Sequence, residues 1–259
     1  MSVFLDSIHG TIDRRILLNY RVAPEVLHRV LPKPFRPKLF AGSGIAGVCM
    51  IRFAALRPRY VPAWLGLGSE NAAHRIAVEW VTDGVPHEGV YIPQRNTNSV
   101  FNRVLGGRVF PGIFQGARFE SSDSADAVGL RIVSADGSPE VSFRGTVASQ
   151  LASTSVFPTL DAAAGFFSLG ATGYSATHRP NSFHGMELHS LNWAVTPLNV
   201  EERFSRYFAD HTRFPIGSVE LDCALLMRGI AHEWRSRPDL YGAGDGTTLS
   251  ATDRPLRSA

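Results

Sequence analysis

Residues 74–93 read HRIAVEWVTDGVPHEGVYIP, and this stretch decides the fold class. Polar and apolar side chains alternate well enough over 74–81 for a half-buried strand. Asp83-Gly84 is a favoured hairpin turn, and residues 88–92 supply the return strand, which we expect to stop at Pro93. The stretch predicts a β-hairpin and therefore antiparallel pairing as the organising feature of the chain.

Further strands and two helices are expected around this hairpin. The 24 glycines and 16 prolines are spread along the chain, which favours many short strands joined by turns. Pro24 opens a short helix over 25–30, and a second helix over 159–169 begins at Thr159 or Asp161 and ends at Gly170. We expect a loop at 57–67, a helix or loop at 94–107, one domain over 1–240 and a disordered tail over 241–259. The other expected strands are 15–20, 45–53, 116–120, 128–134, 141–148, 187–195 and 218–227.

Composition excludes several classes of protein. The 259 residues are 44% apolar and 19% charged, as in an ordinary globular protein, and the formal net charge is only +3. Without a basic run, nucleic acid is not an expected partner. No signal peptide begins the chain and no stretch approaches the roughly 18 apolar residues of a membrane span, so we expect a cytoplasmic protein and no membrane partner.

The residues that commonly hold metals or form covalent intermediates are few. Cys49 and Cys223 are far apart in apolar stretches, which predicts two buried thiols. The nine histidines form no metal-binding spacing, and no phosphate or dinucleotide motif is complete, so we expect neither a metal nor a cofactor. Lys33 and Lys38 are the only lysines, and both lie in the proline-rich segment 32–38.

Two polar stretches could carry chemistry. In the first, residues 68–75, Glu70 lies between a glycine-containing loop and an apolar strand, where burial would suit it to acid/base work. The alternative is that Glu70 caps a turn or pairs with Arg75. The second stretch is 88–98, where a strand ends in successive polar residues that could line a site or could form only a polar turn.

Arginines are the third candidate group. A guanidinium that faces a cavity would clamp a carboxylate with two parallel hydrogen bonds. Most arginines are surface residues, so no single one is decisive by itself. The set considered is Arg14, Arg15, Arg21, Arg95, Arg103 and Arg108.

The segment 20–35, YRVAPEVLHRVLPKPF, resembles the opening of acetoacetate decarboxylases. The fuller resemblance, over about 14–234, is to the uncharacterised YqjF-like family, a domain-of-unknown-function branch of the same superfamily. This resemblance implies a β-rich α+β fold: an antiparallel, cone-like β-barrel with a few flanking helices and a ligand cavity. It also implies that a homo-oligomer is possible. Its motifs are SENAAHRIAVEW (69–80), GVYIP (89–93), GATGYS (170–175), FPIGS (214–218), DCALLMR (222–228) and HEW (232–234).

The resemblance carries site residues over only in part. The active-site glutamate of the decarboxylases matches Glu70, and their essential arginine falls at Arg14 or Arg15. Where the decarboxylases have Pro-Lys-Lys, this chain reads Pro93-Gln94-Arg95. The first of those lysines forms the Schiff base, and neither glutamine nor a permanently charged guanidinium can form an imine.

Two functions of different classes follow from these residues. In the first, Glu70 moves protons while Gln94 and Arg95 hold a carboxylate or carbonyl oxygen, which fits enolisation, hydration/dehydration or cyclisation of an oxo acid. In the second, the cavity binds a small anionic organic ligand without changing it. Schiff-base decarboxylation is a third and least expected possibility. In either of the first two, the ligand carries a carboxylate or carbonyl group, and the residues assigned to its binding are Arg14, Arg15, Tyr91 and His74.

Overall fold

The computed structural model is mostly β, and it describes residues 7–58, 60–100, 103, 112–190 and 193–242. Its helices are α1 (Pro24–Val30) and α3 (Leu160–Leu169), with a short 3-10 turn η1 (Ala63–Leu65). None of the described helices has the length and apolar character that a membrane-spanning helix needs. The strands are β1 (Ser7–Val22), β2 (Arg36–Pro37), β3 (Leu39–Phe40), β4 (Ser43–Pro58), β5 (Leu67–Thr82), β6 (Val85–Thr97), β7 (Phe114–Asp123), β8 (Ala127–Ser134), β9 (Pro139–Val147), β10 (Thr172–Ala176), β11 (Ser182–Ser190), β12 (Thr196–Ser205) and β13 (Val219–Tyr241).

The strands pair in the order β11-β10-β6-β7-β8-β9-β12-β13-β1-β4-β5-β2, and β11 also pairs with β13 and β6 with β5. Two circuits of strands therefore close on themselves, and both contain β13, β1, β4, β5 and β6. The long strand β13 serves both, because its residues 224–226 pair with β12 and its residues 232–241 pair with β11. The family resemblance implies a more specific shape, a cone-like barrel, and this shape stays a prediction.

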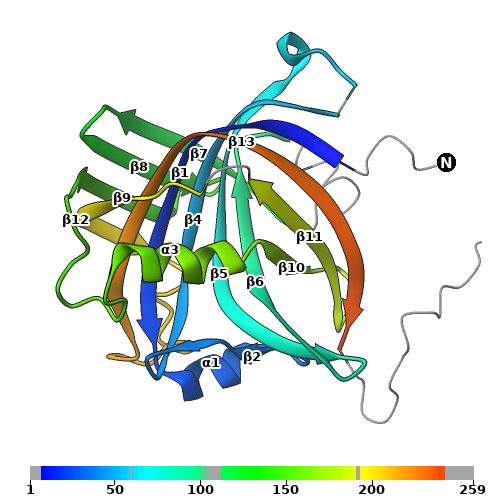
Figure 1. The fold of residues 1–259 in the computed structure, drawn as a ribbon, viewed down its shortest axis with the longest axis vertical. Coiled ribbons are helices and arrows are strands. Elements are labelled where there is room, and N and C mark those ends of the chain that lie inside the picture. Colours follow the sequence, from blue (N-terminus) through cyan, green and yellow to red (C-terminus); the bar gives the residue numbers. More distant parts are fainter. Residues whose placement is uncertain (1–6, 59, 101–102, 104–111, 191–192, 243–259) are drawn as a thin grey trace, which may run out of the picture.

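The shared strands have a core on each face, because successive side chains of a strand point to opposite sides. In β1, Ile16 and Leu18 join one core, while Leu17 joins the other. In β5, Ile76 belongs to the first core and Ala77 to the second. The second core continues into α3, which lies across these strands in Figure 1.

Most of the expected elements are confirmed, and most strands are longer than the sequence indicated. The strand expected at 187–195 is displaced, because β11 ends at Ser190 and residues 193–195 are not strand. The hairpin of β5 and β6, the meander of β7, β8 and β9, and both helices are present. Thr159 begins α3, since its hydroxyl oxygen accepts a hydrogen bond from the backbone N–H of Ala162 at 3.1 Å. The expected loop at 57–67 is mostly η1 and its flanks. The short strands β2 and β3, together with β10 and β12, were not predicted.

The expectation that Pro93 ends its strand is wrong. Strand β6 continues to Thr97, and a β-bulge accommodates the proline, because Arg75 alone lies opposite the two residues Ile92 and Pro93. Of the segment predicted as a helix or loop (94–107), residues 94–97 are therefore strand, and 101–102 and 104–107 lie outside the described residues. The predicted tail also lies outside them from residue 243 onward, and Tyr241 is the last residue of β13.

Candidate functional site

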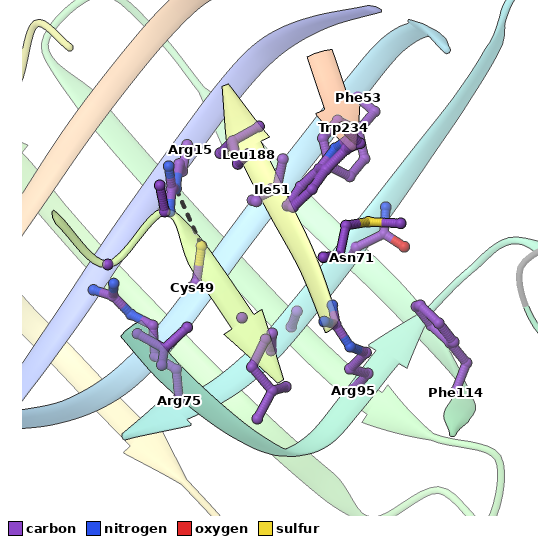
Figure 2. Close-up of a pocket in the computed structure, with 18 of the residues that line it drawn as sticks. Arg15, Cys49, Ile51, Phe53, Asn71, Arg75, Arg95, Phe114, Leu188 and Trp234 are labelled. Atoms are coloured by element: carbon purple, nitrogen blue, oxygen red, sulfur yellow. Dashed lines mark hydrogen bonds between the residues drawn. The ribbon is translucent and has the colours of Figure 1, made fainter. Parts of the chain in front are cut away.

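A cavity of about 90 Å³ lies on the second-core face of the shared strands (Figure 2). Its volume is that of a few water molecules, at roughly 30 Å³ each, and it is far below the roughly 300–1,000 Å³ of a pocket for a drug-sized ligand. The cavity therefore suits a molecule of only a few carbon atoms. Its lining is Arg15, Cys49, Ile51, Phe53, Leu56, Asn71, Ala72, Ala73, Arg75, Val90, Ile92, Arg95, Phe114, Gly170, Ala171, Gly173, Met186, Leu188 and Trp234.

Three arginines give this small cavity its chemical character. Arg15 comes from β1, Arg75 from β5 and Arg95 from β6. No aspartate or glutamate occurs among the described lining residues, and no ion pair joins any of these three guanidiniums to a carboxylate of the described chain. Buried charges are normally paired, so an excess of positive charge at a cavity indicates a site for an anion.

Neutral groups and aromatic rings hold the three guanidiniums in place. Nε of Arg15 donates to Sγ of Cys49 at 3.2 Å, Nη2 of Arg75 to Oδ1 of Asn19 at 2.6 Å, and Nε of Arg95 to Oγ of Ser175 at 3.1 Å. Each guanidinium also lies over an aromatic ring, which is a favourable position for a cation. The rings are those of Trp193 at 4.9 Å from Arg15, Phe167 at 4.9 Å from Arg75 and Phe114 at 5.5 Å from Arg95.

Part of the hydrogen-bonding capacity of these arginines is unused. Nη1 of Arg15 and Nε of Arg75 are buried and have no hydrogen-bond partner among the described residues. Burial lowers the pKa of both Arg75 and Arg95 to about 10, because desolvation disfavours the charged form. Both guanidiniums are still protonated at neutral pH, so the cavity holds positive charge that a bound anion would neutralise.

The β-bulge in β6 explains why Arg95 reaches this cavity. Val90 and Ile92 face the cavity, and strict alternation would place Gln94 beside them. The bulge at Ile92 and Pro93 shifts the register by one residue, so Arg95 takes the cavity face opposite Ala73. Gln94 then points to the other face, where its Nε2 donates to Oε2 of Glu140 at 3.1 Å.

Glu70 does not line the cavity. Its carboxylate accepts hydrogen bonds from Nη2 of Arg14 at 2.9 Å and from Nε of Arg52 at 2.8 Å. Nη1 of Arg14 is also 3.4 Å from Oδ2 of Asp123. The two candidates for the essential arginine therefore lie in different places. Arg15 lines the cavity, whereas Arg14 is fully buried in an ion-pair cluster with Glu70. Arg75 is not the partner of Glu70.

Tyr91 and His74 also lie outside the cavity, within or against the first core. Tyr91 stacks near Phe35 at 5.4 Å between ring centroids, and burial raises the pKa of its hydroxyl. Nε2 of His74 is 2.9 Å from Oγ of Ser205, and complete burial lowers the pKa of His74 to about 3. His74 is therefore neutral at physiological pH.

The structure divides the residues proposed from sequence into two groups. Arg15 and Arg95 meet in the cavity, while Arg14, Glu70, His74, Tyr91 and Gln94 lie elsewhere. Sequence reasoning missed Arg75 and the role of Cys49 as a lining residue. Arg75 could have been found, because it lies on the same side of an alternating strand as Ala73 and Asn71. Both cysteines are buried free thiols, as predicted.

Neither lysine lines the cavity. Nζ of Lys38 forms an ion pair with Oε2 of Glu88 at 2.6 Å and lies 4.6 Å from the centre of the Phe166 ring. Lys38 does line a small neighbouring void of about 10 Å³ that shares Arg75 with the cavity. Lys33 belongs to an open groove beside α1.

Comparison with solved structures shows that the fold is that of acetoacetate-decarboxylase-like proteins. Acetoacetate decarboxylase from Legionella pneumophila superposes with a TM-score of 0.58 at 11% identity, covering 91% of this chain and 85% of that one. The enduracididine biosynthesis enzyme MppR, complexed with pyruvate, gives 0.57 at 11% identity, with 91% and 89% covered. An acetoacetate decarboxylase-like enzyme from Sphingomonas wittichii RW1 gives 0.54 at 12% identity, with 92% of each chain covered.

The chain belongs to the DUF2071 family, described as an uncharacterized conserved protein, whose model matches residues 10–204. No curated protein matches the sequence. The similarity to the solved structures lies far below the identity at which activity is shared, so it establishes the fold and not the reaction.

Proposed function

We propose that this protein binds a small organic anion, a carboxylate of a few carbon atoms, in the cavity of Arg15, Arg75 and Arg95. The observation that carries the proposal is the presence of three guanidiniums without a carboxylate in the described lining. A carboxylate fits this arrangement, because its two oxygens accept charge-assisted hydrogen bonds from guanidinium N–H groups.

The rest of the lining indicates what the carboxylate is attached to. Ile51, Phe53 and Leu188 present apolar surface on the side of the cavity away from Arg75 in Figure 2. A short alkyl or carbonyl-bearing chain would bury its apolar part there. The structure of MppR complexed with pyruvate shows that a protein of this fold holds a ligand of this class.

Acid/base turnover by Glu70 is the alternative proposal, and the geometry supports it less well. Two guanidiniums already occupy the Glu70 carboxylate, and the residue lies outside the cavity lining. A ligand in the cavity would meet a different group for proton transfer. Binding is therefore the function that the arrangement supports best.

Isothermal titration calorimetry with pyruvate, 2-oxobutyrate and acetoacetate tests the proposal. At least one of these acids should bind, and its uncharged methyl ester should bind at least roughly tenfold more weakly, because hydrogen bonds to charged groups contribute about 1.5–3 kcal/mol. Arg75→Gln should weaken binding of the acid by a similar factor. The matched control is Arg118→Gln, which changes an exposed arginine paired with Glu120 on β7.

Equal affinity for the acid and its methyl ester would contradict the proposal. So would the absence of binding by all three acids, or an Arg118→Gln variant that loses as much affinity as Arg75→Gln. Thermal unfolding of each variant provides the check that lost binding does not reflect lost folding.

A further inference from the structure

Cys49 lines the same cavity as the three arginines and contacts one of them, Arg15. It lies on β4, and in Figure 2 its sulfur lies between Arg15 and Arg75, with Arg95 farther along the same wall. Nε of Arg15 donates to Sγ at 3.2 Å. Arg75 and Arg95 line the same cavity as this sulfur, so Cys49 shares a small enclosed space with three cations.

The same cations have room for a ligand. Arg15 and Arg75 are each more than nine-tenths buried, yet Nη1 of Arg15 and Nε of Arg75 have no partner in the described chain. An anion held by the guanidiniums of Arg15 and Arg75 would share the cavity with Cys49. Among the described lining residues, Cys49 has the side chain that can act as a nucleophile toward carbon.

Cys223 shows what an ordinary buried cysteine looks like in this protein. Burial, followed by the neighbouring carboxylate of Asp222, raises the pKa of the Cys223 thiol. Its sulfur is near Nδ2 of Asn19 at 3.5 Å, and it does not line the cavity. A carboxylate lies beside Cys223, whereas the described lining around Cys49 contains none, so Cys223 serves as an internal control for Cys49.

We infer that Cys49 is a nucleophilic thiol that reacts with the anionic electrophiles bound by the arginine cavity, with 2-oxo acids as the natural class. Guanidiniums beside a sulfur stabilise the negative charge of the attacking thiolate. They also concentrate an anion near that sulfur. This inference rests on the proposed anion-binding function and adds a reactive group to it.

The reaction with a 2-oxo acid needs no other reactant. The sulfur of Cys49 forms a bond to the carbonyl carbon, and the π electron pair of the C=O bond moves onto the oxygen. The thiol proton is transferred to that oxygen, which gives a reversible thiohemiketal. A guanidinium nitrogen of the cavity stabilises the oxygen while it carries negative charge.

Alkylation by iodoacetate and by iodoacetamide tests this inference on the intact chain. In both reactions an S–C bond forms, the C–I bond breaks, iodide leaves and the thiol proton passes to solvent. The two reagents differ in charge, so the ratio of their rates at Cys49, divided by the same ratio for N-acetylcysteine, measures attraction of the anion. We expect the corrected ratio to be roughly tenfold or greater, with alkylation located by peptide mass spectrometry.

Variants assign the effect to the cavity. Cys49→Ser should remove the iodoacetate label, and Cys223→Ser should leave the labelling rate unchanged. Arg95→Gln should move the corrected ratio toward one, whereas Arg118→Gln should not. If a variant loses its fold, Cys223 will become labelled as well, and this identifies such a variant independently of the ratio.

A corrected ratio near one, no labelling of Cys49, or equal labelling of Cys223 would overturn the inference. Failure of the inference is distinguishable from failure of the proposed function. If an oxo acid binds in the calorimeter but the ratio is near one, only the thiol inference fails. If no acid binds and the ratio is near one, both fail.

Discussion

Arg14 and Arg15 are neighbours in sequence, but they face opposite sides of β1 and enter two very different groups of charges. On one side, Arg14, Arg52 and Arg228 lie among the carboxylates of Asp13, Glu70 and Asp123, so three cations meet three anions. On the other side, Arg15 shares the cavity with Arg75 and Arg95, and the described lining supplies no carboxylate.

We expect the two groups of charges to have different roles: the first stabilises the fold, and the second binds a ligand. The first cluster is neutral by itself and needs nothing from outside the chain. In the cavity, the described lining offers the cations neutral hydrogen-bond acceptors and aromatic rings but no carboxylate, and a bound anion would supply the opposite charge. We therefore expect substitutions in the neutral cluster to lower stability, and substitutions in the cavity to lower ligand binding.

The largest effect should come from breaking the neutral cluster. Glu70→Gln leaves the fully buried Arg14 without its nearest carboxylate, and removing one partner of a buried pair costs about 3 kcal/mol or more. Urea denaturation should show this loss. The matched control is Glu120→Gln, an exposed carboxylate on β7, which should change stability by less than about 0.5 kcal/mol.

Stability retained in Glu70→Gln, together with abolished turnover of an oxo acid, would instead support the acid/base proposal for Glu70. The two readings of this residue thus predict opposite patterns. If Glu70 is a structural ion-pair residue, the variant loses stability but keeps its ligand affinity in the molecules that remain folded. If Glu70 is the acid/base group, the variant keeps its stability but loses turnover.

A smaller effect of opposite sign should follow from removing a cavity charge. Arg95→Met replaces a cation that has no carboxylate partner among the described residues with an apolar side chain of similar length. We expect the free energy of unfolding without ligand to stay constant or to rise by about 1 kcal/mol. Stabilisation by a saturating oxo acid, measured as a shift in the melting temperature, should fall. A loss of about 3 kcal/mol without ligand would show that Arg95 is a structural residue.

The smallest effect at neutral pH concerns His74, on the same face of β5 as Glu70. Its pKa is about 3 in the folded protein and its ordinary value is 6.5, because burial disfavours the protonated form. Between pH 6.5 and about 3, the unfolded chain binds a proton at His74 that the folded chain does not. The free energy of unfolding should therefore fall as the pH decreases through this range.

The comparison of wild type with His74→Asn isolates this contribution. The stability advantage of wild type over the variant should shrink between pH 7 and pH 4, because only the wild type carries the depressed pKa at this position. His211→Asn, a change at an exposed histidine, is the control and should follow the wild type. An advantage that stays constant with pH would contradict the neutral, buried state of His74.

The sequence was a good guide to the elements and a poor guide to the faces of the strands. Alternation and the Asp83-Gly84 turn predicted the β5–β6 hairpin correctly, because both are local signals. Which side chains meet depends on the face of the strand to which each residue points. A single bulge moves every following side chain to the opposite face. The bulge at Pro93 placed Arg95 in the cavity and directed Gln94 away from it.

Two other features of the site lie beyond local patterns. Arg14 and Arg15 could not be distinguished by sequence, because a register shift lies between Ile12 and Arg14 in the pairing of β1 with β4. Cys49 was correctly predicted to be buried, but its place in one cavity with arginines from three strands depends on the tertiary pairing of β1, β4, β5 and β6.

The pairing of β1 with β13 also determines when the cavity can exist. Asn19 pairs with Cys223 across 204 residues of chain, and the cavity needs Arg15 from one of these strands and Trp234 from the other. At the usual 5–20 residues per second of synthesis, β13 is made on the order of 10–40 s after β1. During that interval one edge of β1 has no partner and can pair with another chain. A nascent chain of this protein should therefore depend on protection from aggregation until β13 has paired with β1.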